Sequence, residues 1–110
     1  MIFDSDGATT IVFQEDISLQ KFLKNLNEGF PKIKNDHIIV NLFSFSNLTT
    51  DDLMEFYQLS DTHRKAEKSF VLVTDKVPYD QVPEALIVVP TLQEAQDIIE
   101  MEEIERDLDL

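Results

Sequence analysis

Residues 37–65 read HIIVNLFSFSNLTTDDLMEFYQLSDTHRK, an apolar run followed by a polar loop and an amphipathic pattern. The run at 38–43 is almost continuously apolar, as in a central strand that is covered on both faces. Beyond the loop, larger side chains recur at spacings of three and four, so we expect Leu53 and Tyr57 to pack on this strand. The segment therefore predicts a buried strand and then a helix at 50–66, a unit typical of α/β domains.

Hydroxyl and amide side chains fill the loop between this strand and this helix. Their oxygens can accept hydrogen bonds from nearby backbone N–H groups, and Thr49 or Thr50 is a suitable N-cap for the helix. Acidic residues at 51 and 52 suit the positive end of the helix dipole. The loop residues that we select as functional candidates are Asn47, Thr49, Asp51 and Asp52.

The rest of the sequence predicts further strands and two further helices. An Asp-Gly turn joins 2–4 to 9–13 in an antiparallel hairpin. A helix at 18–28 is expected to end at Gly29, with Pro31 preventing its continuation. Two more strands are expected at 69–74 and 86–89, and a last helix at 91–106. We therefore predict one α/β domain with a central mixed sheet of four or five strands, mainly parallel after the hairpin and covered by helices.

Acidic side chains outnumber basic ones by 22 to 9, which gives a net charge of −13. Residues 93–110 hold eight of these acids and one Arg. Such a field repels phosphate backbones and attracts basic protein surfaces, so we expect a protein partner and no nucleic acid. No apolar run approaches the roughly 18 residues of a membrane span, and the acidic start is unlike a signal peptide. We expect a cytoplasmic protein that does not enter membranes.

Recognised catalytic patterns are missing from the sequence. The two glycines, Gly7 and Gly29, cannot form a phosphate-binding loop, and there is no cysteine. The isolated His37 and His63 are expected at a strand entrance and on a helix rim, both solvated. We predict no catalytic residue, no metal ligand and no cofactor. The alternative is a small metal-dependent hydrolase or nuclease, which would need three or four surface carboxylates converging in a pocket.

The order of elements and the sequence between 38 and 99 resemble a STAS domain, the module of bacterial anti-sigma factor antagonists and of sulfate-transporter tails. In that family an apolar strand ending in Asp-Leu leads to an Asp-Ser-Ser-Gly-Leu signature at a helix start. Here the strand ends with Asn41 and Leu42, and the loop reads TTDDL at 49–53. The closing PTLQEA at 90–95 is similar to the family's last strand and the start of its final helix. The resemblance implies a non-catalytic regulatory or scaffolding module that binds another protein.

The resemblance also singles out Thr50 as a candidate phospho-acceptor. It falls where regulated antagonists carry the phosphorylated serine. A phosphate there would meet the like charges of Asp51 and Asp52, although a helix start would favour it. A role as the helix N-cap accounts for this threonine without phosphorylation.

The chain also resembles a group of short acidic bacterial proteins with a nearly identical PTLQEA...IIEMEEIERDL ending, some of which are labelled ribonuclease Z. That enzyme is similar to metallo-β-lactamases, which hold two zinc ions with a His-x-His-x-Asp-His cluster and further ligands. With only His37 and His63, this chain cannot form that cluster. The sequence therefore does not support the ribonuclease activity.

The last helix carries two apolar stripes, and we divide the chain into a domain at 1–100 and an acidic helical extension at 101–110. The second stripe lies nearly opposite the first on a helical wheel, so a straight helix cannot bury both. Either the helix bends near residue 100, or the second stripe faces away from the sheet and binds a partner or a second copy. A frayed acidic end is the remaining alternative. The predicted partner-binding residues are Met101, Ile104, Leu108, Glu102 and Glu105.

Overall fold

The computed structural model of the chain describes residues 1–108. Its strands are β1 (Ile2–Asp6), β2 (Thr9–Phe13), β3 (His37–Asn41), β4 (Phe70–Val73) and β5 (Val88–Val89). Its helices are α1 (Leu19–Ile33), α2 (Thr50–Met54), α3 (Tyr57–Lys65) and α4 (Leu92–Leu108), with a 3-10 turn η1 at Tyr79–Gln81. None of these helices is long and apolar enough to cross a bilayer.

The strands form one mixed sheet in the order β1-β2-β3-β4-β5. β1 and β2 are antiparallel, whereas β2 with β3, β3 with β4, and β4 with β5 are parallel pairs. Gly7 in the β1–β2 turn has a φ of 64°, a left-handed conformation that glycine adopts at little cost. The predicted α/β domain with a mixed sheet and an opening hairpin is therefore confirmed.

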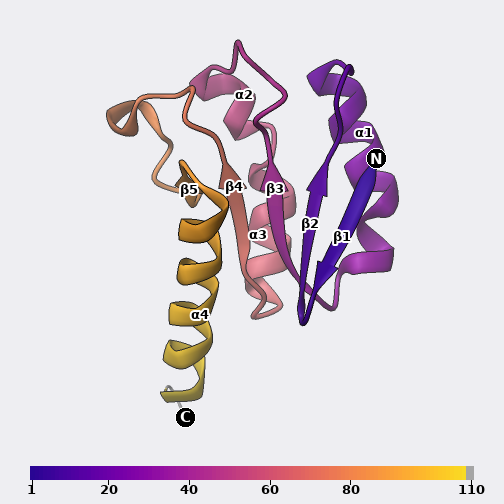
Figure 1. Cartoon of the computed structure of the whole chain (residues 1–110). Helices are drawn as coiled ribbons and strands as arrows, with labels where there is room; N and C mark the ends of the chain where they lie inside the picture. The colour runs from indigo at the N-terminus through magenta and orange to yellow at the C-terminus, as the bar shows by residue number, and fades with distance from the viewer. Residues whose placement is uncertain (109–110) are drawn as a thin grey trace.

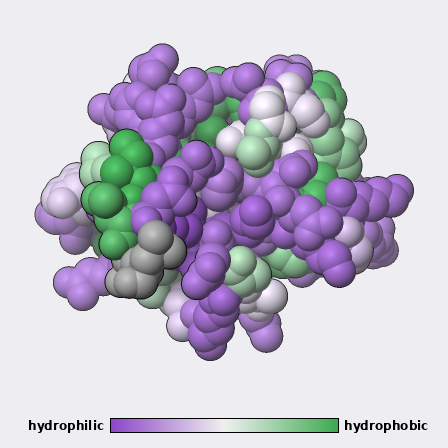
Figure 2. All heavy atoms as spheres, turned by 90° about the horizontal axis from the view of Figure 1, so that it is seen from below, coloured by the Kyte–Doolittle hydropathy of each residue, from purple (hydrophilic) through white to green (hydrophobic). Residues whose placement is uncertain are grey.

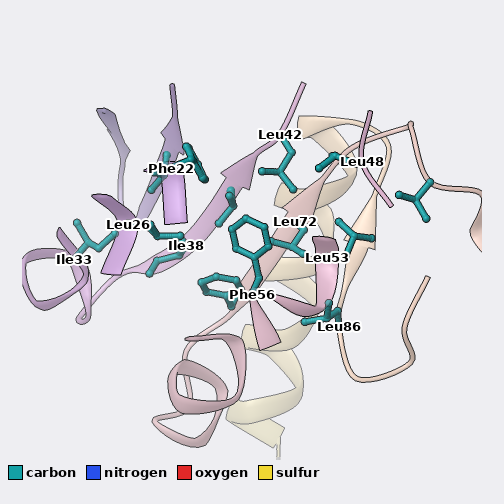
Figure 3. Close-up of a cluster of buried hydrophobic side chains, with 14 residues drawn as sticks. Phe22, Leu26, Ile33, Ile38, Leu42, Leu48, Leu53, Phe56, Leu72 and Leu86 are labelled. Carbon is teal, nitrogen blue, oxygen red and sulfur yellow. The ribbon is translucent and has the colours of Figure 1, made fainter. Parts of the chain in front are cut away.

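Helices cover both faces of the sheet unequally, with α1 to α3 on one face and α4 on the other (Figure 1). Successive residues of β3 point to opposite faces, so Ile38 and Val40 join the α1–α3 cluster and Ile39 joins the α4 cluster. Figure 3 shows Phe22 of α1 and Leu53 of α2 within the larger cluster. The central strand is therefore covered on both faces, as its sequence predicts.

The first helix does not end at Gly29, so that prediction is wrong. A Cβ built on Gly29 would lie 2.7 Å from Cζ of Phe3, so the glycine lets the hairpin approach the helix. The helix continues through Pro31 to Ile33. Phe30 is half-buried and Ile33 is buried in the core, and we infer that this packing offsets the hydrogen bond that proline cannot donate.

The predicted helix at 50–66 is divided into α2 and α3 by a break at residues 55 and 56. Leu53 of α2 and Phe56 in the break itself are completely buried, and Ser60 of α3 is also buried. Tyr57 is 41% exposed, so its predicted burial is wrong. The buried positions 53, 56, 60 and 63 keep helical spacing across the break, and Tyr57 lies at the exposed edge of that face.

Replacing Leu53 by Ala should lower the free energy of unfolding by about 2 to 5 kcal/mol, because the truncation leaves a cavity in the core. Tyr57→Ala, at the exposed first position of α3, is the matched control and should cost much less than Leu53→Ala. Urea denaturation of the two variants measures both losses. A larger loss for Tyr57→Ala than for Leu53→Ala would contradict this placement of α2 and α3.

Candidate functional site

The inner face of α4 changes from apolar to charged along its length. In the first half, Ala95 and Ile99 are buried against Ile39, Val71 and Val73 of the sheet. Glu102 and Arg106 lie three and seven residues beyond Ile99, so they continue the same helical face. The helix therefore meets the sheet through apolar contacts at one end and polar contacts at the other.

The polar contacts form a connected group that we call the polar anchor. Its members are His37, Arg64, Ser69, Glu102, Glu103 and Arg106. Ser69 Oγ donates a hydrogen bond to Glu102 Oε1 over 2.6 Å and accepts from the Arg106 guanidinium over 3.2 Å. The Arg64 guanidinium donates to Glu102 Oε2 over 2.9 Å. Ser69, the residue before β4, is thus bonded to the two charged residues of the inner face of α4.

His37 extends the polar anchor to a third element, β3. The backbone N–H of Ser69 donates to His37 Nδ1 over 3.0 Å, so Nδ1 is an acceptor and carries no proton. The proton of the neutral ring therefore lies on Nε2, which is 2.8 Å from Glu103 Oε1 and donates to it. His37 joins Ser69 to α4 only in this neutral tautomer.

Both histidines lie inside the protein, contrary to the prediction that they are solvated. His37 is 5% exposed, and His63 is 1% exposed. His63 Nε2 donates to the backbone carbonyl of Asp36 over 2.6 Å, and its ring packs edge to face on Phe30 and Phe70. Helical spacing from Phe56 and Ser60 was a sequence signal for the inward placement of His63, but the hydrogen-bond partners that permit burial of both histidines are distant in sequence.

Burial and hydrogen bonding shift three pKa values in this region. Desolvation lowers the pKa of His37 and outweighs the raising effect of Glu103. Desolvation also lowers the pKa of His63, against the effect of the Asp36 carbonyl. Burial alone would raise the pKa of Glu102, but hydrogen bonds from Arg64 and Ser69 bring it below its usual value. The folded protein therefore favours neutral histidines beside an ionised Glu102.

The outer face of α4 carries the second apolar stripe. Met101, Ile104 and Leu108 are 53%, 59% and 79% exposed, in a helix that continues past residue 100 to Leu108. Apolar side chains gather beside the end of α4 with hydrophilic surface around them (Figure 2). The stripe therefore faces away from the sheet, while residues 109 and 110 of the predicted extension lie outside the described residues.

The acids near the apolar stripe have different positions. Glu105 and Asp107 are exposed and border the stripe. The side chain of Glu102 is only 15% exposed because it is held in the polar anchor. Glu102 therefore does not flank the stripe as expected but fixes the opposite face of the helix. The spacing from Ala95 through Ile99 to Glu102 was the sequence signal for this inward placement.

Hydrogen bonds of Thr49 and Thr50 fix the loop at the start of α2. Thr49, the N-cap, accepts from the Asp52 N–H over 3.2 Å, and its own N–H donates to Asp52 Oδ2 over 3.0 Å. Thr50 is the first residue of α2, and its hydroxyl donates to the Gln81 carbonyl over 2.8 Å. Asn47 and Asp51 are exposed. Thr49 is thus the cap, and the expectation that Thr50 caps the helix is wrong because Thr50 already lies inside the first turn. The phospho-acceptor role of Thr50 stays a prediction.

Metal-binding chemistry would require several donor side chains in one place. Within residues 1–108 the structure has no group of three or more His, Cys, Asp or Glu side chains that could hold a metal ion. Of the carboxylates on α4, Glu102 and Glu103 bind different partners in the polar anchor. The structure therefore offers no donor group to which the hydrolase alternative could be assigned.

Comparisons with known proteins give no family. No protein-family model matches the chain, and no curated protein matches it either. The STAS resemblance therefore stays a prediction.

Thr49→Ala should lower the free energy of unfolding by about 1 kcal/mol, because the first turn of α2 loses its cap. Thr49→Ser keeps the oxygen and should be nearly neutral, and Thr50→Ala should cost less than Thr49→Ala. Chemical denaturation of the three variants measures these differences. If Thr50→Ala were the most costly, the cap would be at Thr50 after all.

The free energy of unfolding should fall as the pH drops below about 6.5, the usual pKa of an unfolded histidine. His37 and His63 have lowered pKa values in the folded state, so the unfolded chain binds more protons there. The loss is at most about 1.4 kcal/mol per pH unit for each histidine. A separate loss from Glu102, whose folded pKa is lowered, should begin only near pH 4.3.

Urea denaturation at a series of pH values measures this dependence. Replacing both histidines by non-titrating Asn and Gln provides the control, in which the loss between about pH 6.5 and pH 5 should disappear. A wild-type stability that is constant across this interval would contradict the lowered histidine pKa values.

Proposed function

We propose that this protein is a non-catalytic module that binds another protein, and that the outer face of α4 is its binding surface. The observation that carries the proposal is the row of three exposed apolar side chains, Met101, Ile104 and Leu108, on one helix face. Contiguous exposed apolar side chains with a polar border are typical of protein interaction sites. A helix that presents residues at this spacing can insert them into an apolar groove.

The polar anchor supports the proposal because it holds the helix ready for binding. Hydrogen bonds to Glu102, Glu103 and Arg106 fix the side of α4 that lies opposite the apolar stripe. The stripe is therefore presented on a helix that is already formed and oriented. Less conformational entropy is lost on binding than for a segment that must first fold.

Charge favours a partner with a basic surface over a second copy of the chain. The segment 93–110 carries eight acids against one Arg, and Glu105 and Asp107 border the stripe directly. Two copies that met through this face would bring like charges together. A groove with Lys or Arg at its rim would instead gain from the same acids. The proposed partner is therefore a different protein with an apolar groove and a basic edge.

The biological role that we propose for this interaction is based on the sequence resemblance. The resemblance to STAS domains supports a regulatory or scaffolding role, as in an anti-sigma factor antagonist. The metal-dependent hydrolase has no comparable support among residues 1–108, where no donor cluster is found. Calorimetric titration with magnesium, manganese and zinc separates the two proposals, because only the hydrolase requires saturable binding of a metal ion.

The double variant Met101→Gln with Ile104→Gln should lose partner binding without losing stability. Both side chains are exposed and glutamine is a good helix former, so the melting temperature should stay the same within a few degrees. Loss of two anchors should cost at least about 2 kcal/mol of binding energy, or about 30-fold in Kd. Affinity capture identifies the partner, and titration of the purified partner measures the Kd of each variant.

Two further variants serve as controls. Tyr79→Ser removes an aromatic side chain that is 94% exposed on η1, outside the apolar stripe of α4, and should leave binding unchanged. Glu105→Gln should weaken binding at low salt and have less effect at high salt, since surface charges are screened. Equal binding by the wild type and the Met101 and Ile104 double variant would contradict the proposed surface.

A further inference from the structure

The two halves of α4 are attached to the sheet by different forces. Ala95 and Ile99 hold the first half through burial of apolar surface, which does not depend on protonation. Beyond Ile99, the contacts to the sheet side are those of Glu102, Glu103 and Arg106 in the polar anchor. Attachment of the second half therefore depends on the charge and hydrogen-bonding state of these groups.

One backbone group makes this attachment sensitive to a proton. The N–H of Ser69 can only donate, and its acceptor is His37 Nδ1 at 3.0 Å. A proton on Nδ1 would place two donors against each other in a buried position, which breaks the hydrogen bond and leaves the Ser69 N–H unpaired. Either Ser69 or the His37 ring would then have to move, and both are bonded to α4, Ser69 through Glu102 and Arg106 and the ring through Glu103.

We propose that His37 is a pH-dependent latch for the second half of α4, which stays on the sheet while His37 is neutral and detaches when it is protonated. Detachment would withdraw residues 101–108 from their fixed orientation while Ala95 and Ile99 remain packed. The latch concerns the protein alone, and it holds whether or not the outer face of α4 binds a partner.

Charged groups around His37 act in both directions. Glu103 on α4 favours the protonated ring through its carboxylate, whereas Arg106 on α4 and Lys68 before β4 oppose it. His63 on α3 also interacts with His37 and opposes a second positive charge. Burial adds to this opposition, and the pKa of His37 is lowered as a result. Protonation of His37 in the attached state therefore requires a lower pH than protonation of a solvated histidine.

Hydrogen exchange of the full-length protein, followed by NMR at each backbone amide, tests the latch. Protection factors, corrected for the intrinsic effect of pH, are compared between about pH 7.5 and pH 5.5, on either side of the usual histidine pKa. Protection at 101–108 should fall by up to about tenfold by pH 5.5, because each pH unit below the usual histidine pKa of about 6.5 changes the detachment equilibrium at most tenfold. Protection at 95–99 should change much less.

Two matched variants assign the effect to one histidine. His37→Asn keeps an acceptor for the Ser69 N–H and cannot titrate, so protection at 101–108 should no longer depend on pH. His63→Gln keeps a donor for the Asp36 carbonyl, and the pH dependence at 101–108 should remain. A dependence that survives His37→Asn and disappears with His63→Gln would overturn the proposal.

A second test of the latch uses only the wild-type protein and therefore does not depend on whether the variants fold. NMR titration of the histidine rings gives the midpoint for His37 and for His63. The loss of protection at 101–108 should follow the His37 midpoint. Full protection of 101–108 after His37 has become protonated would overturn the latch.

Discussion

Burial of the middle of β3 on both faces of the sheet is the constraint on which the rest of the structure depends. Ile38, Ile39 and Val40 have no exposed surface, although they point alternately to the two faces of the sheet. Both faces must therefore be covered, and α1, α2 and α3 supply one layer while α4 supplies the other. At roughly 25 cal/mol per Å² of apolar surface, this burial is the main force that assembles the layers.

The second layer consists of one helix, and this explains the distribution of polar groups. The apolar inner face of α4 ends at Ile99, yet the helix continues to Leu108 beyond it. Beyond Ile99 the inner face consists of charged residues. Glu102 accepts a hydrogen bond from Ser69, and Glu103 accepts one from His37. Since the inner face is occupied by charge, the apolar side chains of this half lie outside. The candidate binding surface and the polar anchor therefore occupy opposite faces of the second half of α4.

Several features could be predicted because they depend on local sequence. Turn chemistry around Gly7 indicated the hairpin, and the apolar run at 38–43 indicated the central strand. The spacing of Met101, Ile104 and Leu108 indicated a second apolar stripe opposite the first, but the structure was needed to show that this stripe is exposed. The sequence also predicted that Thr49 or Thr50 begins a helix. The hydrogen bond from the Asp52 N–H to the Thr49 hydroxyl was needed to show that Thr49 is the cap. These signals depend on residues within one turn or one strand of each other.

The sequence by itself determined the α/β class, the hairpin, the acidic charge and the two-sided last helix, because short-range periodicity and composition decide them. Only the tertiary structure decided the features that depend on residues far apart in the chain. The contact of Phe3 with Gly29 explains a glycine inside a helix, and Asp36 and Ser69 supply the hydrogen bonds of the two buried histidines. Helical spacing indicates the inward direction of Glu102, but its partners Arg64 and Ser69 are brought beside it by the packing of α3, β4 and α4. The identity of such partners follows from packing, and no local pattern encodes it.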